Sequence, residues 1–158
     1  QPYVLPNSGV AYTVGLLRSV GKMLINFFHA THGIPVLSSL EHPLTVEKEK
    51  SILGFDCRGD AEALLRKWNF QEEVVSPILF QDTPFECEGV RPLACLLNVT
   101  ATGIRDLPPG QLVDEPKSLR SSLKTDGGLL SAINLSPKAL FDGLVESTID
   151  FQAFSKSL

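Results

Sequence analysis

Three histidines, His29, His32 and His42, are the side chains of this sequence best suited to holding a metal ion. His29 and His32 are three residues apart, so a helix would carry both imidazoles on one face, an arrangement that can bind a divalent metal. No carboxylate lies between them to complete a coordination shell. Histidines near a helix end also suit the negative end of the helix dipole. We therefore name these three as metal candidates but expect a polar helix end and no cofactor.

Three carboxylates and one thiol could act as acids, bases or nucleophiles, namely Asp56, Asp60, Asp82 and Cys57. Asp56 and Asp60 stand at the start of an apolar helical stretch, where aspartate caps free backbone N–H groups, so we favour a structural role for both. Cys57 has Arg58 as its only adjacent cation and matches no cysteine-enzyme signature, which indicates a small, half-buried residue. No G-x-S-x-G phrase supports a serine hydrolase.

The composition is that of a globular, mildly acidic protein. The chain has 158 residues, 43% hydrophobic and 20% charged, and a net charge of −4. This length and composition fit one domain, over 1–158, with a continuous apolar core. An acidic chain has no excess positive charge to neutralise a phosphate backbone, so we expect no nucleic-acid partner.

The cysteines and the apolar segments indicate a cytoplasmic protein. The three cysteines are odd in number and form no C-x-x-C pair, so neither a disulfide framework nor a zinc site is expected. The most apolar stretch, 10–28, contains Arg18 and Lys22, each costing roughly 2.5–3.5 kcal/mol at the centre of a membrane span, so no membrane association is expected. No secretory signal is recognisable, and the start at Gln1 suggests a piece of a longer protein.

Apolar spacing of three and four residues predicts helices throughout, and no segment alternates with period two. The first helix is predicted over 9–28, with a second apolar stripe (Leu16, Val20, Met23 and Phe27) that should be covered as well. Gly21 lies within the main stripe, which suggests that another element approaches closely there. The fold class is therefore all-α.

Further helices are predicted along the rest of the chain, at about 45–53, from 56 to Trp68 with Trp68 buried, from Gln71 with a kink at Pro77, and from about 89 to 103. Prolines and glycines punctuate 105–128, which predicts a long irregular loop. Ser136 followed by Pro137 predicts the start of a last helix, over about 136–156, whose buried side includes Phe151. Phe151 and Phe154 could alternatively form a surface patch.

Three phrases in order resemble the HDOD domain, an all-helical relative of the HD phosphohydrolases found in bacterial signalling proteins. They are GLLRSVGK at 15–22, EKSILGFDC at 49–57 and ALLRKWNFQEEVV at 63–75, and the resemblance covers about 7–103. The family reads "GLLHDIGK" at the first phrase. It also implies a divalent metal, held by a His–Asp pair and by a more distant His and Asp, that activates water.

At the positions where the resemblance implies metal ligands, this chain carries other residues. The His–Asp pair falls on Arg18 and Ser19, the histidine of the second phrase on Cys57, and the aspartate of a later helix on Ala101. A paired-histidine region falls at about Phe80 and Gln81. A permanent cation and a hydroxyl cannot replace a neutral imidazole and a carboxylate. The first histidine would lie before residue 1.

These substitutions leave three hypotheses. The first is a non-catalytic HDOD-like regulatory module that contacts other proteins or domains of a signalling pathway. The second is a phosphohydrolase with residual, metal-dependent activity. The third is a small-ligand sensor in which Arg18 clamps a phosphate or carboxylate in the remnant cleft, although Arg18 could equally be a surface residue whose stem covers apolar neighbours.

Overall fold

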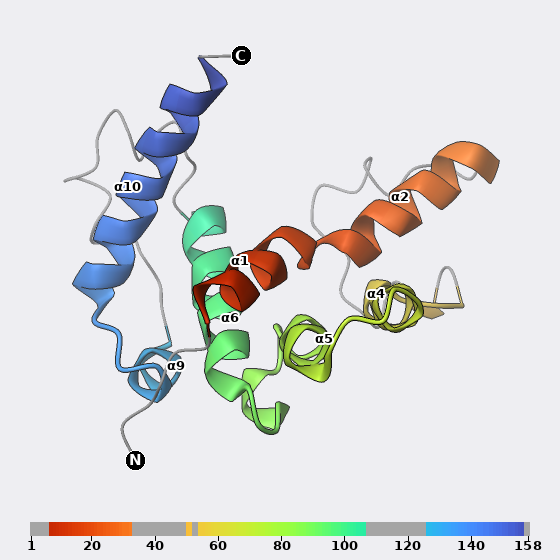
Figure 1. The fold of residues 1–158 in the computed structure, drawn as a ribbon, viewed down its shortest axis with the longest axis horizontal. Helices are drawn as coiled ribbons and strands as arrows, with labels where there is room; N and C mark the ends of the chain where they lie inside the picture. The colour runs from red at the N-terminus through yellow and green to blue at the C-terminus, as the bar shows by residue number, and fades with distance from the viewer. Residues whose placement is uncertain (1–6, 33–49, 52–53, 107–125, 157–158) are drawn as a thin grey trace.

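The computed structural model describes residues 7–32, 50–51, 54–106 and 126–156. Every regular element in these residues is a helix (Figure 1), so the chain is all-α, as the sequence predicted. In chain order the elements are α1 (Ser8–Leu17), α2 (Val20–His32), α4 (Cys57–Lys67), α5 (Glu72–Leu79), the 3₁₀ helix η2 (Pro84–Glu86), α6 (Arg91–Asp106), α9 (Gly127–Ala132) and α10 (Pro137–Ser155).

The long first helix predicted over 9–28 is two helices, which corrects that prediction. α1 ends at Leu17, a turn follows at Arg18 and Ser19, and α2 begins at Val20. The carbonyl of Arg18 accepts a hydrogen bond from Nε2 of Gln81 at 3.1 Å, so a side chain from the turn after α5 satisfies a group at the break. The break lets α1 pack on α5 while α2 packs on α4.

Side-chain caps fix the starts of α4 and α10 close to where the sequence placed them. Oδ1 of Asp56 accepts from the backbone N–H groups of Arg58 and Gly59 at 2.9 and 3.0 Å, and Oγ of Ser136 accepts from that of Ala139 at 3.1 Å. The predicted loop over 105–128 is corrected at its two ends, while its middle, 107–125, lies outside the described residues. Oδ1 of Asp126 accepts from the N–H of Gly128 at 2.7 Å and starts α9, while α6 continues to Asp106.

Two apolar clusters hold the described helices together, and α6 belongs to both. One cluster joins α1, α4, α5 and α6 through Val14, Leu65, Val75, Ile78, Leu93 and Leu97, among others. The other joins α6, α9 and α10 through Cys95, Val99, Leu130, Leu140 and Phe141, among others. In Figure 1, α6 accordingly lies between α5 and the α9–α10 pair.

Several predicted burials are wrong. Leu16, Met23 and Phe27 of the second stripe are 64–70% exposed, whereas Val20, its fourth member, is partly buried against the cluster of α1, α4, α5 and α6. Trp68 is 54% exposed; it follows the last residue of α4 and is not part of the cluster that contains Leu65. Phe151 is 68% exposed, since the buried residues of α10 lie in its first half, at Leu140, Phe141 and Leu144.

Other predictions fall on residues outside the described part of the chain. Most of the helix predicted at 45–53 does so, although Lys50 and Ser51 are helical. No helix among the described residues is long and apolar enough to cross a membrane.

Candidate functional site

The four positions at which the resemblance implies metal ligands line one polar cleft. Arg18 and Ser19 come from the junction of α1 and α2, Cys57 from the first turn of α4, and Ala101 from the middle of α6. The end of α5 and the turn after it form a further wall. The cleft has a volume of about 270 Å³. Segments far apart in the sequence therefore converge here.

A chain of side-chain hydrogen bonds ties the walls of the polar cleft together. Nδ2 of Asn98, on α6, donates to the carbonyl of Gln81 at 2.8 Å. Nε2 of Gln81 in turn donates to the carbonyls of Arg18 and Ile78, at 3.1 and 3.0 Å. Sequence reasoning missed this role of both amides. The signal available for Asn98 was a polar residue within the apolar pattern of α6.

The floor of the polar cleft is a direct contact between α2 and α4. A Cβ atom at Gly21 would lie 1.8 Å from the carbonyl oxygen of Cys57, so only glycine fits. The sequence predicted a close approach at Gly21, and the structure confirms it. Because no side chain separates the two backbones there, Cys57 and Ser19 are brought to the same cleft.

The polar cleft gathers positive charge although the whole chain carries −4. Its lining includes Arg18, Lys22, Arg58 and Arg105, with Asp82 as the one carboxylate among its described residues. Nη2 of Arg58 lies 3.2 Å from Oδ2 of Asp82. Within the described part of the chain, neither Arg18 nor Lys22 forms an ion pair. The cleft is therefore an attractive environment for an anion.

One donor beside the polar cleft is buried without an acceptor. Nε of Arg58 is buried and makes no hydrogen bond with any described residue, a condition that costs roughly 1–3 kcal/mol. The side chain as a whole is 29% exposed because its Nη2 end reaches Asp82. Arg58 is thus held in place with its hydrogen-bonding capacity only partly used.

The donor set of the polar cleft does not fit the metal that the HD superfamily implies. Guanidinium and ammonium groups donate hydrogen bonds and do not ligate metals, and a methyl group does neither. Cys57 is the one side chain at the four positions that commonly ligates a metal. Among the described residues, no group of three or more His, Cys, Asp or Glu side chains is placed to hold an ion. His42 and the side chains of His29 and His32 lie outside the described residues.

Asp56 holds the start of α4, and with it Cys57 and Arg58. Burial by itself would raise the pKa of Asp56, but hydrogen bonds from the backbone N–H groups of Gly59 and Arg58 and the ammonium of Lys50 outweigh it. The pKa of Asp56 therefore lies below its usual range. Nζ of Lys50 is 3.1 Å from Oδ2 of Asp56. This supports the capping role predicted for Asp56 in preference to a catalytic one.

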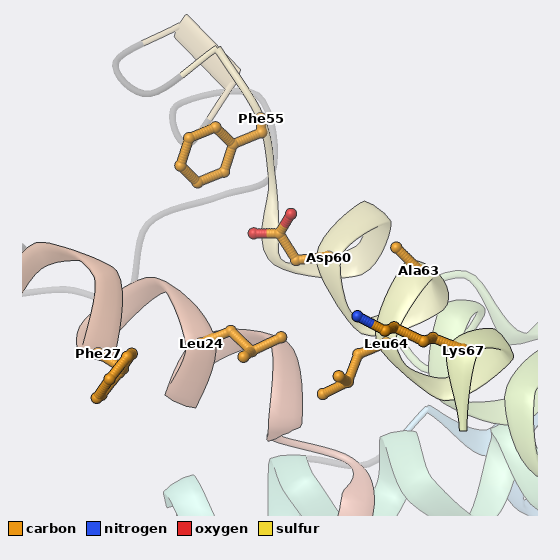
Figure 2. A pocket seen from close by; sticks show the side chains of 7 residues that line it. All are labelled: Leu24, Phe27, Phe55, Asp60, Ala63, Leu64 and Lys67. Carbon is orange, nitrogen blue, oxygen red and sulfur yellow. The ribbon is translucent and has the colours of Figure 1, made fainter.

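A second, apolar hollow lies between other faces of the same two helices, with a volume of about 460 Å³. Figure 2 shows Leu24 of α2 and Leu64 of α4 facing each other, with Phe27 farther along α2 and Phe55 on the segment that leads into α4. Lys67 is the cation of its lining. We call this the apolar hollow. Sequence reasoning did not find it, because it depends on how α2 crosses α4.

The described residues form helices only, and the residues at the positions of an HD metal site lie together in one cleft. These two features define an HD-type domain. A family model for the HDOD domain matches residues 4–84, which is half of the chain, and the chain belongs to this family. The HDOD domain is a signalling-associated relative of the HD domains. No curated protein and no solved structure matches the chain.

Proposed function

We propose that this HDOD domain is a non-catalytic regulatory module of a bacterial, cytoplasmic signalling pathway, which works by contacting other proteins or domains. The observation that carries the proposal is the polar cleft itself. Arg18, Ser19, Cys57 and Ala101 stand together where the resemblance implies metal ligands, and three of the four cannot serve in a divalent-metal shell of imidazoles and carboxylates.

The apolar hollow supports the second half of the proposal, that the module acts through contacts. Phe27, which lines the hollow, is 70% exposed, and most of the other lining residues are apolar. Exposed apolar surface of this kind is typical of protein–protein contact sites. A partner that inserts apolar side chains between α2 and α4 would gain their burial.

The test of the non-catalytic part is an activity assay with added metal. The purified protein is incubated with manganese or iron(II) and with phosphomonoester, phosphodiester and cyclic dinucleotide substrates. We expect no more product than a heat-killed sample releases, because the cleft cannot hold the metal that activates water. Metal-dependent release above that background, lost in Cys57→Ala, would overturn the proposal and support the phosphohydrolase hypothesis.

The test of the contact part is a capture experiment with matched variants. Phe27→Ser is compared with Phe85→Ser, since Phe85 is also exposed, at 52%, but lies on η2 away from the apolar hollow. The domains encoded with or beside this chain are the partners to probe. We expect Phe27→Ser to weaken a contact that Phe85→Ser leaves intact. Equal binding by both variants and the parent would contradict this use of the hollow.

A further inference from the structure

The polar cleft has the chemistry of a binding site for a small oxyanion. Arg18 and Lys22 reach it from the α1–α2 junction and Arg58 from the first turn of α4, so the cations come from two separate segments. They converge in an acidic chain, where scattered surface cations would be expected to pair with the carboxylates in excess. Instead, Arg18 and Lys22 pair with none in the described part of the chain.

Two further observations indicate an anion in preference to a neutral ligand. The buried Nε of Arg58 has no acceptor among the described residues, and a movement of the guanidinium group toward a bound anion would give it one. Arg58 meanwhile holds Asp82, a 61% exposed carboxylate, with a single contact of 3.2 Å. The carboxylate of Asp82 thus already makes, with Arg58, the kind of contact that the oxygen atoms of a ligand could make in its place.

The dimensions favour a small ligand or the end group of a larger one. A volume of about 270 Å³ lies just below the range of roughly 300–1,000 Å³ that is usual for pockets holding a whole drug-sized ligand. Guanidinium groups match the paired oxygens of phosphates and carboxylates, and a phosphate dianion gains most from three cations. Terminal phosphate groups therefore fit the cleft better than monocarboxylates do.

We propose that the polar cleft binds a phosphate group, either as free inorganic phosphate or at the end of a nucleotide, with Arg18, Lys22 and Arg58 as its donors. The inference rests on the proposed non-catalytic function and names the input of the module. Bound phosphate contacts the α1–α2 junction and α4 together.

The experiment measures binding by isothermal titration calorimetry with three probes: inorganic phosphate, adenosine 5′-monophosphate and neutral adenosine. Both phosphates should bind, and more weakly as salt is raised, whereas adenosine should not. Binding of the nucleotide alone would assign the source to a nucleotide phosphate, and equal binding of both would assign it to phosphate as such. Failure of both phosphates to bind overturns the inference, as does equal binding of adenosine and the nucleotide.

Variants of opposite charge make the test independent of folding. Arg18→Ala and Lys22→Ala should each weaken phosphate binding about fivefold or more, whereas Asp82→Asn should tighten it about threefold, because a competing carboxylate is removed. Lys138→Ala and Asp142→Asn, exposed on α10, are the matched controls and should change the affinity by less than about twofold. A gain in affinity cannot come from misfolding, so an unchanged or weaker affinity in Asp82→Asn counts against the site.

The hydrolysis assay separates failure of this inference from failure of the proposed function. Phosphate binding with no hydrolysis supports both. Binding accompanied by metal-dependent hydrolysis of the nucleotide upholds the anion site and overturns the non-catalytic function. Absence of binding together with absence of hydrolysis overturns the anion site and leaves the non-catalytic function standing.

Discussion

The polar cleft and the apolar hollow are built on the same two helices and have opposite chemistry. α4 presents Cys57, Arg58 and Ala61 to the cleft, and Asp60, Leu64 and Lys67 to the hollow. Each set repeats at three- and four-residue spacing, so the two sets are two faces of one helix. The described part of this chain therefore offers two separate surfaces, a polar one that carries several cations and an apolar one that is open.

The two regions also differ in how they are held. The polar cleft is enclosed by segments from α2, α4, α5 and α6, and the amides of Gln81 and Asn98 join three of its walls. The apolar hollow is bordered by α2, α4 and the residue Phe55 before α4 (Figure 2). A site held by several elements should resist change in any one of them, whereas the hollow should adapt to what binds it.

The largest expected effect comes from the contact that both regions share. Gly21→Ala places a Cβ 1.8 Å from the carbonyl oxygen of Cys57, so a backbone must move. We expect a loss of about 3 kcal/mol in the free energy of unfolding, measured by urea denaturation, and loss of both surfaces. Gly15→Ala is the control, because a Cβ there meets nothing within 4 Å; it should be neutral or stabilise α1 by roughly 0.5–1 kcal/mol. Equal stabilities of the two variants would disprove the close contact.

The cap of α4 should affect both surfaces to a smaller degree. Asp56→Ala removes the acceptor for two backbone N–H groups and should lower the free energy of unfolding by about 1–2 kcal/mol at neutral pH. Since the pKa of Asp56 is lower in the folded state, its contribution is fully present above about pH 4 and is lost as the pH falls through the lowered value. The free energies of unfolding of parent and variant should therefore approach each other as the pH is lowered from 7 into the acid range. A difference that stays constant with pH would show that the charge of Asp56 does not stabilise the fold. Asp142→Ala on α10 is the control.

A third variant should separate the two surfaces. Gln81→Ala removes the donor to the Arg18 carbonyl and should lower the free energy of unfolding by about 1 kcal/mol. Amide exchange measured by NMR should rise around Arg18 and stay unchanged around Leu64. Gln71→Ala is the control, since Gln71 is exposed and its side chain makes no capping bond. Equal exchange at both sites in the variant would mean that the amides do not hold the cleft.

The smallest effect is expected on the other surface. Phe27→Ala truncates a side chain that is 70% exposed, so the free energy of unfolding should change by less than about 0.5 kcal/mol. Chemical denaturation checks this value. A loss of more than about 1 kcal/mol would show that Phe27 is covered in solution and that the hollow is not an open surface.

Local signals could be read from the sequence, and contacts between distant segments could not. The side chains of Asp56 and Ser136 cap their helices by bonding to backbone groups three residues further on. A glycine within an apolar helical stripe, Gly21, indicated that another element approaches closely there. The break at Arg18 depends on Gln81, 63 residues further along the chain, so no window of the sequence contains both. The start of α9 was missed because Gly127 and Gly128 are poor helix formers, whose helix is secured by Asp126 and by burial of Leu130.

The same distinction holds for the candidate site. The resemblance named Arg18, Ser19, Cys57 and Ala101, and the structure brings all four together. Lys22 closes the first matching phrase and Arg58 follows the second, but neither was named as a site residue, because the resemblance was used only for its metal-ligand positions. That 1–158 forms a single domain stays a prediction.

The contact at Gly21 separates the shape of the site from its chemistry. Where two main chains touch, the distance between their helices is set by backbone atoms, so as long as residue 21 is glycine the side chains on the walls do not determine it. Residues around that point can then be exchanged freely, from metal ligands to cations or to a methyl group, while the opening keeps its width.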